Sequence, residues 1–198
     1  MSASRLVATK LSQLRPFCTA AAAAAGEVTW EIGKPMRLYQ KLAALGAAGG
    51  SVSSTLNEHV MDGNQVEEND LVKIAHELLK YGRPDHALQV MEWMENRKMK
   101  FSLANTAFCL DLISKVKGVA EAENYFQNLP ASAKEKFTYS TLLNCYCSNG
   151  MEEKALSLFK EMEELNIAHS TLHYNNLMSL YLIVGKVERI PSLVEEMK

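Results

Sequence analysis

Apolar residues recur along the C-terminal two thirds of the chain with the period of amphipathic helices. Between Tyr139 and Tyr146, four apolar residues at i, i+3, i+4 and i+7 mark one helical face, and Gly150 follows as a residue that can end a helix. A second stripe with the same spacing runs from Ala155 to Met162. The pattern predicts two antiparallel amphipathic helices joined by a short turn.

The same hairpin pattern returns at intervals of about 35 residues. A shift of 35 residues places Tyr174 and Gly185 where Tyr139 and Gly150 stand, and two further hairpins match towards the N-terminus. One hairpin cannot bury its apolar face alone, so a tandem series predicts an all-α fold, an α-solenoid of about four helix-turn-helix repeats. The expected repeats span about residues 68–102, 103–135, 136–170 and, incomplete, 171–198.

Three segments of these repeats carry a resemblance to a known family: Phe137–Leu143 (FTYSTLL), Gly150–Met162 (GMEEKALSLFKEM) and Leu172–Met178 (LHYNNLM). They resemble pentatricopeptide repeats, and the expected member is a plant organellar protein of the P type. The tetratricopeptide repeat has a similar period, but its Trp-Leu-Gly-Tyr pattern is not found here. The resemblance covers about residues 68–198 and is strongest in the last two repeats.

The first 26 residues differ in composition from the repeats. They contain Arg5, Lys10 and Arg15, several hydroxyl residues and no acidic residue, and their apolar residues from Val7 to Phe17 fall on one helical face. A basic amphipathic segment of this kind predicts an organellar transit peptide over residues 1–26. The mitochondrial matrix is the favoured destination, and the chloroplast is the alternative.

Residues 27–67 are expected to form a lead-in of two short helices, interrupted by a glycine-rich stretch at 46–51, that caps the first repeat. Within that repeat, Asp70 is expected to be the N-cap of the first helix. Trp93 lies beside the apolar stripe of the second helix, which favours a packing role over base stacking.

Composition and charge limit the possible functions. No run of 18 apolar residues exists, so no membrane insertion is expected, and four cysteines without paired spacing indicate reduced thiols. Without residues 1–26 the chain keeps all 23 acidic residues but 18 of its 21 basic ones, which leaves a net charge near −5. Such a charge disfavours nucleic-acid binding unless the basic residues gather on one face.

The sequence contains no constellation typical of catalysis or of cofactor binding, so neither an enzyme nor a cofactor is expected. His169 and His173 are four residues apart but straddle the junction between two repeats, which disfavours a zinc site. The acidic clusters that include Glu152 and Glu161 are expected to be solvated, at helix starts or on exposed faces.

The resemblance implies a set of RNA-binding residues. In the family, one base is read by the polar residue after the first-helix tyrosine together with the last residue of that repeat. An apolar residue two places before the tyrosine sandwiches the base. This implies Ser140, Ser170 and Phe137 in the third repeat, and Asn175 with Leu172 in the fourth. Hydroxyl and amide groups suit base edges because they both donate and accept hydrogen bonds.

The equivalent positions in the first two repeats are Val72 and Ala107, which cannot hydrogen-bond a base. The fourth repeat stops about seven residues short, so we expect the chain to be the front part of a longer array. The leading hypothesis is an organellar adaptor that binds single-stranded RNA and acts in transcript processing, stability or translation. The alternative is a protein-interaction scaffold in an organellar ribosome or another RNA-processing complex.

Overall fold

The computed structural model describes residues 34–45, 50–167 and 170–197. The expected transit peptide at 1–26 lies outside these residues, as does His169. All the regular structure in the described residues is helical. Within the same residues, no helix combines the length and the apolar character that crossing a membrane requires.

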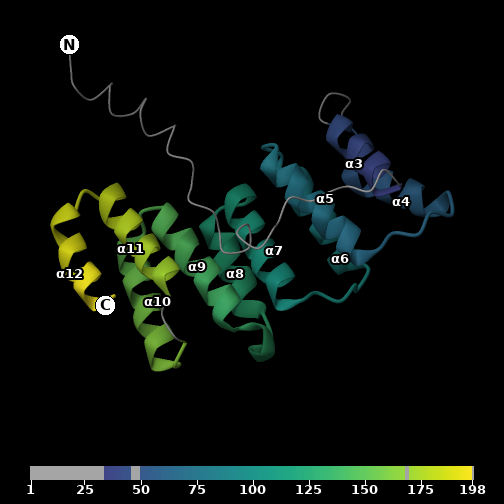
Figure 1. Ribbon diagram of the computed structural model, residues 1–198. Coiled ribbons are helices and arrows are strands. Elements are labelled where there is room, and N and C mark those ends of the chain that lie inside the picture. The colour runs from purple at the N-terminus through teal and green to yellow at the C-terminus, as the bar shows by residue number, and fades with distance from the viewer. Residues whose placement is uncertain (1–33, 46–49, 168–169, 198) are drawn as a thin grey trace, which may run out of the picture.

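The helices follow one another as antiparallel pairs, which form a row from α3 to α12 (Figure 1). The row confirms the predicted all-α solenoid with a helical pair at its N-terminal end. The bounds are α3 (Lys34–Ala44), α4 (Val52–Met61), α5 (Glu68–Lys80), α6 (Pro84–Asn96), α7 (Leu103–Val116), α8 (Val119–Asn128), α9 (Lys136–Ser148), α10 (Glu152–Glu164), α11 (Thr171–Ile183) and α12 (Ile190–Glu196). Two short 3₁₀ turns, Ala131–Ala133 and Val187–Arg189, precede α9 and α12.

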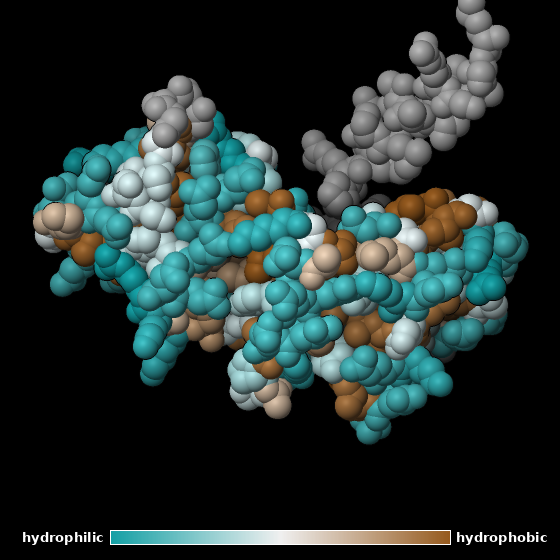
Figure 2. Space-filling model, turned by 180° about the vertical axis from the view of Figure 1, so that it is seen from behind, coloured by the Kyte–Doolittle hydropathy of each residue, from teal (hydrophilic) through white to brown (hydrophobic). Residues whose placement is uncertain are grey.

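The apolar stripes of successive pairs merge into one core that extends from Leu38 in α3 to Leu193 in α12. Helix α9 is buried on most of its sides because it packs against α7, α10 and α11. Cys145 and Cys147 therefore both lie in the interior, although they point in different directions around α9. Outside the core, hydrophilic residues cover most of the surface seen from behind, and hydrophobic residues gather in separate patches (Figure 2).

Each helix of the third repeat, α9 and α10, is followed by a residue with left-handed backbone conformation. Gly150 follows α9 with φ of +68°, where the N–H of Met151 reaches back to the carbonyl of Tyr146 at 3.0 Å. This arrangement satisfies carbonyl groups at the helix end, and glycine adopts it without a steric penalty. Asn166, with φ of +55°, occupies the corresponding place after α10, so the second helix ends without glycine.

The predicted N-cap of α5 is wrong. The helix begins at Glu68, its N-cap is Glu67, and Asp70 lies inside the first turn, 3.7 Å from Lys73. An acidic side chain is favourable at any position of the first turn because the helix dipole is positive there. Several acidic residues in succession therefore do not identify the N-cap by themselves.

The lead-in helix α4 is tied to α6 through Trp93. The indole Nε1–H donates to Asn57 Oδ1 at 2.9 Å, and the Arg97 guanidinium donates to the same oxygen at 3.0 Å. Arg97 also lies over the indole ring, 4.2 Å from its centre. Trp93 is only 6% exposed, so it is a packing residue, as the sequence predicted.

Helices α5 and α7 meet through an aromatic stack. The His76 imidazole lies parallel to the ring of Phe108, with 3.9 Å between the ring centres. Burial lowers the pKa of His76, while the nearby carboxylates of Asp111 and Glu77 act in the opposite direction. The stack therefore favours the neutral imidazole.

Asn57→Ala is expected to destabilise the lead-in, because it removes the acceptor of the nearly buried Trp93 N–H group. We expect a loss of about 1–2 kcal/mol in the free energy of unfolding, measured by urea titration with circular dichroism. Asn57→Asp retains an oxygen acceptor and is the matched control. Equal stability of the two variants would contradict this role of Asn57.

His76→Gln is expected to make stability less sensitive to acid. The unfolded chain binds a proton at His76 near the ordinary pKa of about 6.5, whereas the folded chain binds it only at lower pH. Stability should therefore fall as pH drops below about 6.5, and fall less in the variant. Urea titrations at neutral pH and near pH 5.5 measure the difference. Parallel losses in both proteins would show that His76 is not the titrating group.

Candidate nucleic-acid interface

The first helices of the repeats form a row in which α9 lies between α7 and α11 (Figure 1). The second helices α6, α8 and α10 each pack against the first helix of their own pair, and α6 and α8 also pack against the first helix of the next pair. A linear ligand that runs along the row would meet one first helix in each repeat. This is the arrangement in which repeat proteins read RNA one base at a time.

Charge is divided between the first and second helices. The first helices balance their basic residues, Lys73, Lys80, Lys115 and Lys136, against equally many acidic ones, Glu68, Asp70, Glu77 and Asp111. The second helices carry Lys154 and Lys160 against a much larger acidic set: Asp85, Glu92, Glu95, Glu121, Glu123, Glu152, Glu153, Glu161, Glu163, Glu164, Glu195 and Glu196. The negative charge of the repeats therefore lies on the second helices.

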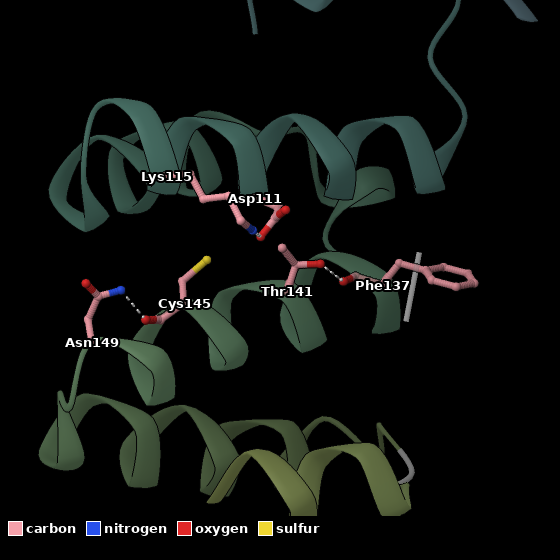
Figure 3. Close-up of polar contacts among 6 residues, drawn as sticks. All are labelled: Asp111, Lys115, Phe137, Thr141, Cys145 and Asn149. Atoms are coloured by element: carbon pink, nitrogen blue, oxygen red, sulfur yellow. Dashed lines mark hydrogen bonds and ion pairs between the residues drawn. The ribbon is translucent and has the colours of Figure 1, made fainter. Parts of the chain in front are cut away.

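The single carboxylate of α7 is neutralised within its own helix. Asp111 is 4% exposed and faces the gap between α7 and α9, where Lys115 from the next turn contacts it (Figure 3). Helices α9 and α11 contain no acidic residue at all. Among the described residues, the helices α7, α9 and α11 thus offer an anionic ligand no unpaired carboxylate.

One edge of α9 carries Phe137, Thr141, Cys145 and Asn149, which are spaced four residues apart (Figure 3). The Thr141 hydroxyl donates to the carbonyl of Phe137 at 3.0 Å, and the Asn149 amide donates to the carbonyl of Cys145 at 2.8 Å. These polar groups are thus satisfied by their own helix. The Phe137 ring is 53% exposed and is the group on this edge placed to meet a ligand.

The other RNA-binding residues implied by the resemblance lie on or beside α9 and α11. Ser140 is partly buried on α9, and its Oγ donates to the carbonyl of Lys136 at 2.5 Å. Ser170 is the N-cap of α11, Leu172 is partly buried in its first turn, and Asn175 is exposed one turn later. The structure thus places these side chains at the N-terminal ends of two neighbouring helices.

His173 is the residue at this site that sequence reasoning missed. Its side chain is fully buried, with Nδ1 accepting from the Ser170 backbone N–H at 3.1 Å and Nε2 lying 2.6 Å from Ser140 Oγ. The available signal was its register, because His173 follows the buried capping residue Thr138 by the 35-residue period. Among the described residues, no cluster of three potential metal ligands is found.

The first two repeats lack polar groups at the equivalent positions. Val72 is partly buried on α5 and Ala107 is buried on α7, and neither side chain can hydrogen-bond. Close to these positions, α5 and α7 pack against each other through the stack of His76 on Phe108. At the position that follows the first-helix tyrosine, a polar side chain is therefore present only in the third and fourth repeats.

Two acidic residues that were expected to be solvated have structural partners. Glu161 accepts a hydrogen bond from the Tyr139 hydroxyl at 3.0 Å, and burial together with this bond raises the pKa of Tyr139 to about 12. Glu152 accepts from Lys186 Nζ at 2.6 Å. Glu161 is exposed, as expected, whereas Glu152 is only partly exposed. The hydrophobic period indicates which face of a helix is polar but not which residues of another helix lie opposite.

Comparison with known proteins agrees with the repeat geometry. A PPR repeat model matches residues 137–167, and a pentatricopeptide repeat domain model matches residues 157–198. Two mitochondrial pentatricopeptide repeat-containing proteins of Arabidopsis thaliana are 48% identical over 162 residues and 40% identical over 193 residues.

These alignments include 81% and 93% of this chain but only 30% and 38% of the relatives. A third such Arabidopsis protein is 41% identical over 166 residues, which is 83% of this chain and 34% of the relative. The chain thus spans about a third of the length of the curated relatives it matches. The repeat period, the paired helices and these similarities together show that the chain belongs to the pentatricopeptide repeat family.

Proposed function

We propose that this chain binds single-stranded RNA along the row of first helices and acts as an organellar adaptor in transcript processing, stability or translation. The observation that carries the proposal is the division of charge. The excess of carboxylates lies on the second helices, whereas α9 and α11 contain no acidic residue. An RNA backbone can approach these first helices without meeting the negative charge that the whole chain carries.

The side chains on the same surface support base recognition. Phe137 presents an exposed aromatic ring at the start of α9, and stacking on such rings is a general way to hold unpaired bases. Ser140 and Asn175 provide the hydroxyl and amide groups that can read base edges. In this proposal Phe137, Ser140 and Ser170 contact one base, and Leu172 and Asn175 contact the next.

The proposed location is the mitochondrial matrix. Several of the Arabidopsis relatives are named as mitochondrial proteins, which supports this choice. The composition of residues 1–26, with basic and hydroxyl residues and no acidic residue, supports the same destination. The repeats would then meet RNA transcribed within the organelle.

A second candidate function is a protein-interaction scaffold in an organellar ribosome or RNA-processing complex. It is favoured by exposed apolar side chains near the end of α11, where Leu182, Ile183 and Val187 are 61%, 51% and 54% exposed. Apolar residues exposed close together in the sequence suit contact with another polypeptide. RNA binding that depends on the first-helix residues distinguishes the two functions.

The double variant Ser140→Ala with Asn175→Ala is expected to weaken RNA binding roughly 10-fold, because each change removes one base-reading hydrogen bond. Fluorescence anisotropy with short single-stranded oligomers of A, C, G or U measures affinity and base preference. The matched control is Ser157→Ala with Asn124→Ala, which removes the same two side-chain types from the exposed surface of second helices. Equal binding by both double variants would contradict the assignment of these reading residues.

The charge argument is tested by two variants, one that reverses a charge on a first helix and one that reverses a charge on a second helix. Lys136→Glu lies at the start of α9, whereas Lys160→Glu lies on α10, and both change the net charge equally. We expect Lys136→Glu to weaken RNA binding and to lower the slope of log affinity against log salt by about 0.7, the loss of one phosphate contact. Lys160→Glu should leave both quantities close to parental values. Equal effects would show that only total charge matters.

A further inference from the structure

His173 connects the two residues proposed to read one base in the third repeat. Its Nδ1 accepts a hydrogen bond from the backbone N–H of Ser170 at 3.1 Å. Its Nε2 lies 2.6 Å from the Oγ of Ser140, which belongs to the neighbouring first helix. The imidazole is fully buried, so these contacts are held in the interior of the repeat junction.

The directions of these hydrogen bonds follow from counting protons. A backbone N–H can only donate, so Nδ1 accepts, and in a neutral imidazole the proton then resides on Nε2. Nε2–H therefore donates to Ser140 Oγ. The one hydroxyl proton of Ser140 is directed to the carbonyl of Lys136, 2.5 Å away. Both ends of the chain of hydrogen bonds require the same tautomer.

This arrangement fixes what Ser140 can offer a ligand. Its hydroxyl proton is occupied by the Lys136 carbonyl, so only a lone pair of the oxygen is left for a base. Ser170 has the opposite character. Its backbone carbonyl accepts from the N–H of His173 at 2.8 Å, and its hydroxyl donates to no carbonyl among the described residues, so the hydroxyl proton is available for donation.

The preceding repeat provides an internal comparison. Thr138 occupies the same capping position as His173, and its hydroxyl accepts from the backbone N–H of Glu135 at 3.1 Å. The same hydroxyl donates to the carbonyl of Ala133. The position equivalent to Ser140 is Ala107, which has no group to bond. A threonine is therefore sufficient for capping, and the longer imidazole of His173 adds the hydrogen bond to Ser140.

We propose that His173 is a positioning residue that holds Ser140 as a hydrogen-bond acceptor and sets its place relative to Ser170. This inference rests on the proposed function and adds to it a determinant of base preference outside the three residue positions that the family resemblance implies. The ligand group that Ser140 recognises is an N–H of a nucleobase. Ser170 supplies the complementary donor for an acceptor atom of the same base.

The first test concerns the imidazole itself and needs no RNA. Long-range ¹H–¹⁵N correlation spectra of the whole chain at neutral pH report which ring nitrogen of His173 carries the proton. We expect a protonated Nε2 and an unprotonated Nδ1. A proton on Nδ1, or on both nitrogens, would overturn the proposed hydrogen-bond chain.

The second test separates the effect of the hydrogen bond between His173 and Ser140 from the effect of capping α11. His173→Thr introduces the residue that caps the preceding repeat, so folding and thermal stability should stay close to parental values, measured by circular dichroism. Anisotropy with single-stranded oligomers of A, C, G or U should show the ratio of best to worst affinity falling roughly fivefold, the effect of one net hydrogen bond. Ser140→Ala should lower this ratio similarly, and the double variant should be no worse than Ser140→Ala alone.

The control variant His86→Thr removes a histidine from the second helix α6 and should retain the parental ratio. A base preference that survives in His173→Thr but is lost in Ser140→Ala would overturn the positioning role while leaving RNA binding intact. A parental chain that binds none of the oligomers would overturn the proposed function itself. The failure of the inference and the failure of the function are therefore distinguishable.

Discussion

The structure depends on the stacking of one helical pair on the next. Helix α9 shows the constraint most clearly, because α7, α10 and α11 surround it and bury side chains on most of its faces. Only part of the surface of α9 remains available to a ligand, and α11 is more exposed. The polar groups on these surfaces have three fates: Thr141 bonds to its own helix, Ser140 bonds to its neighbour, and Asn175 is exposed.

The same stacking accounts for the distribution of charge. A carboxylate buried between two helices is costly unless it is paired, and the one acidic residue of α7, Asp111, lies against Lys115. Helices α8 and α10 pack against fewer neighbours than α7 and α9 and accommodate acidic residues, some of which also join helices, as Glu152 does with Lys186. From α7 onwards the first helices therefore carry little negative charge, and this is the surface that an anionic chain can approach.

His173 illustrates how a structural position can acquire a second role. The N-terminal end of every first helix needs acceptors for its free N–H groups, and a side chain in the first turn supplies one of them. In α9 a threonine meets this need, whereas in α11 the larger imidazole also reaches Ser140. A capping residue and a residue proposed to read a base are thereby joined across two repeats.

The sequence by itself determined the helices, the repeat period and the buried stripes, because these depend on local periodicity that each segment carries on its own. It also identified Trp93 as a packing residue. Only the tertiary structure decided which side chains meet between helices, such as Trp93 with Asn57 and His173 with Ser140. A periodic pattern defines the face of a helix, but the register between neighbouring helices follows from how their side chains interlock. The sequence misplaced the N-cap of α5 at Asp70 because acidic side chains are favourable at several positions of the first turn and do not mark its start.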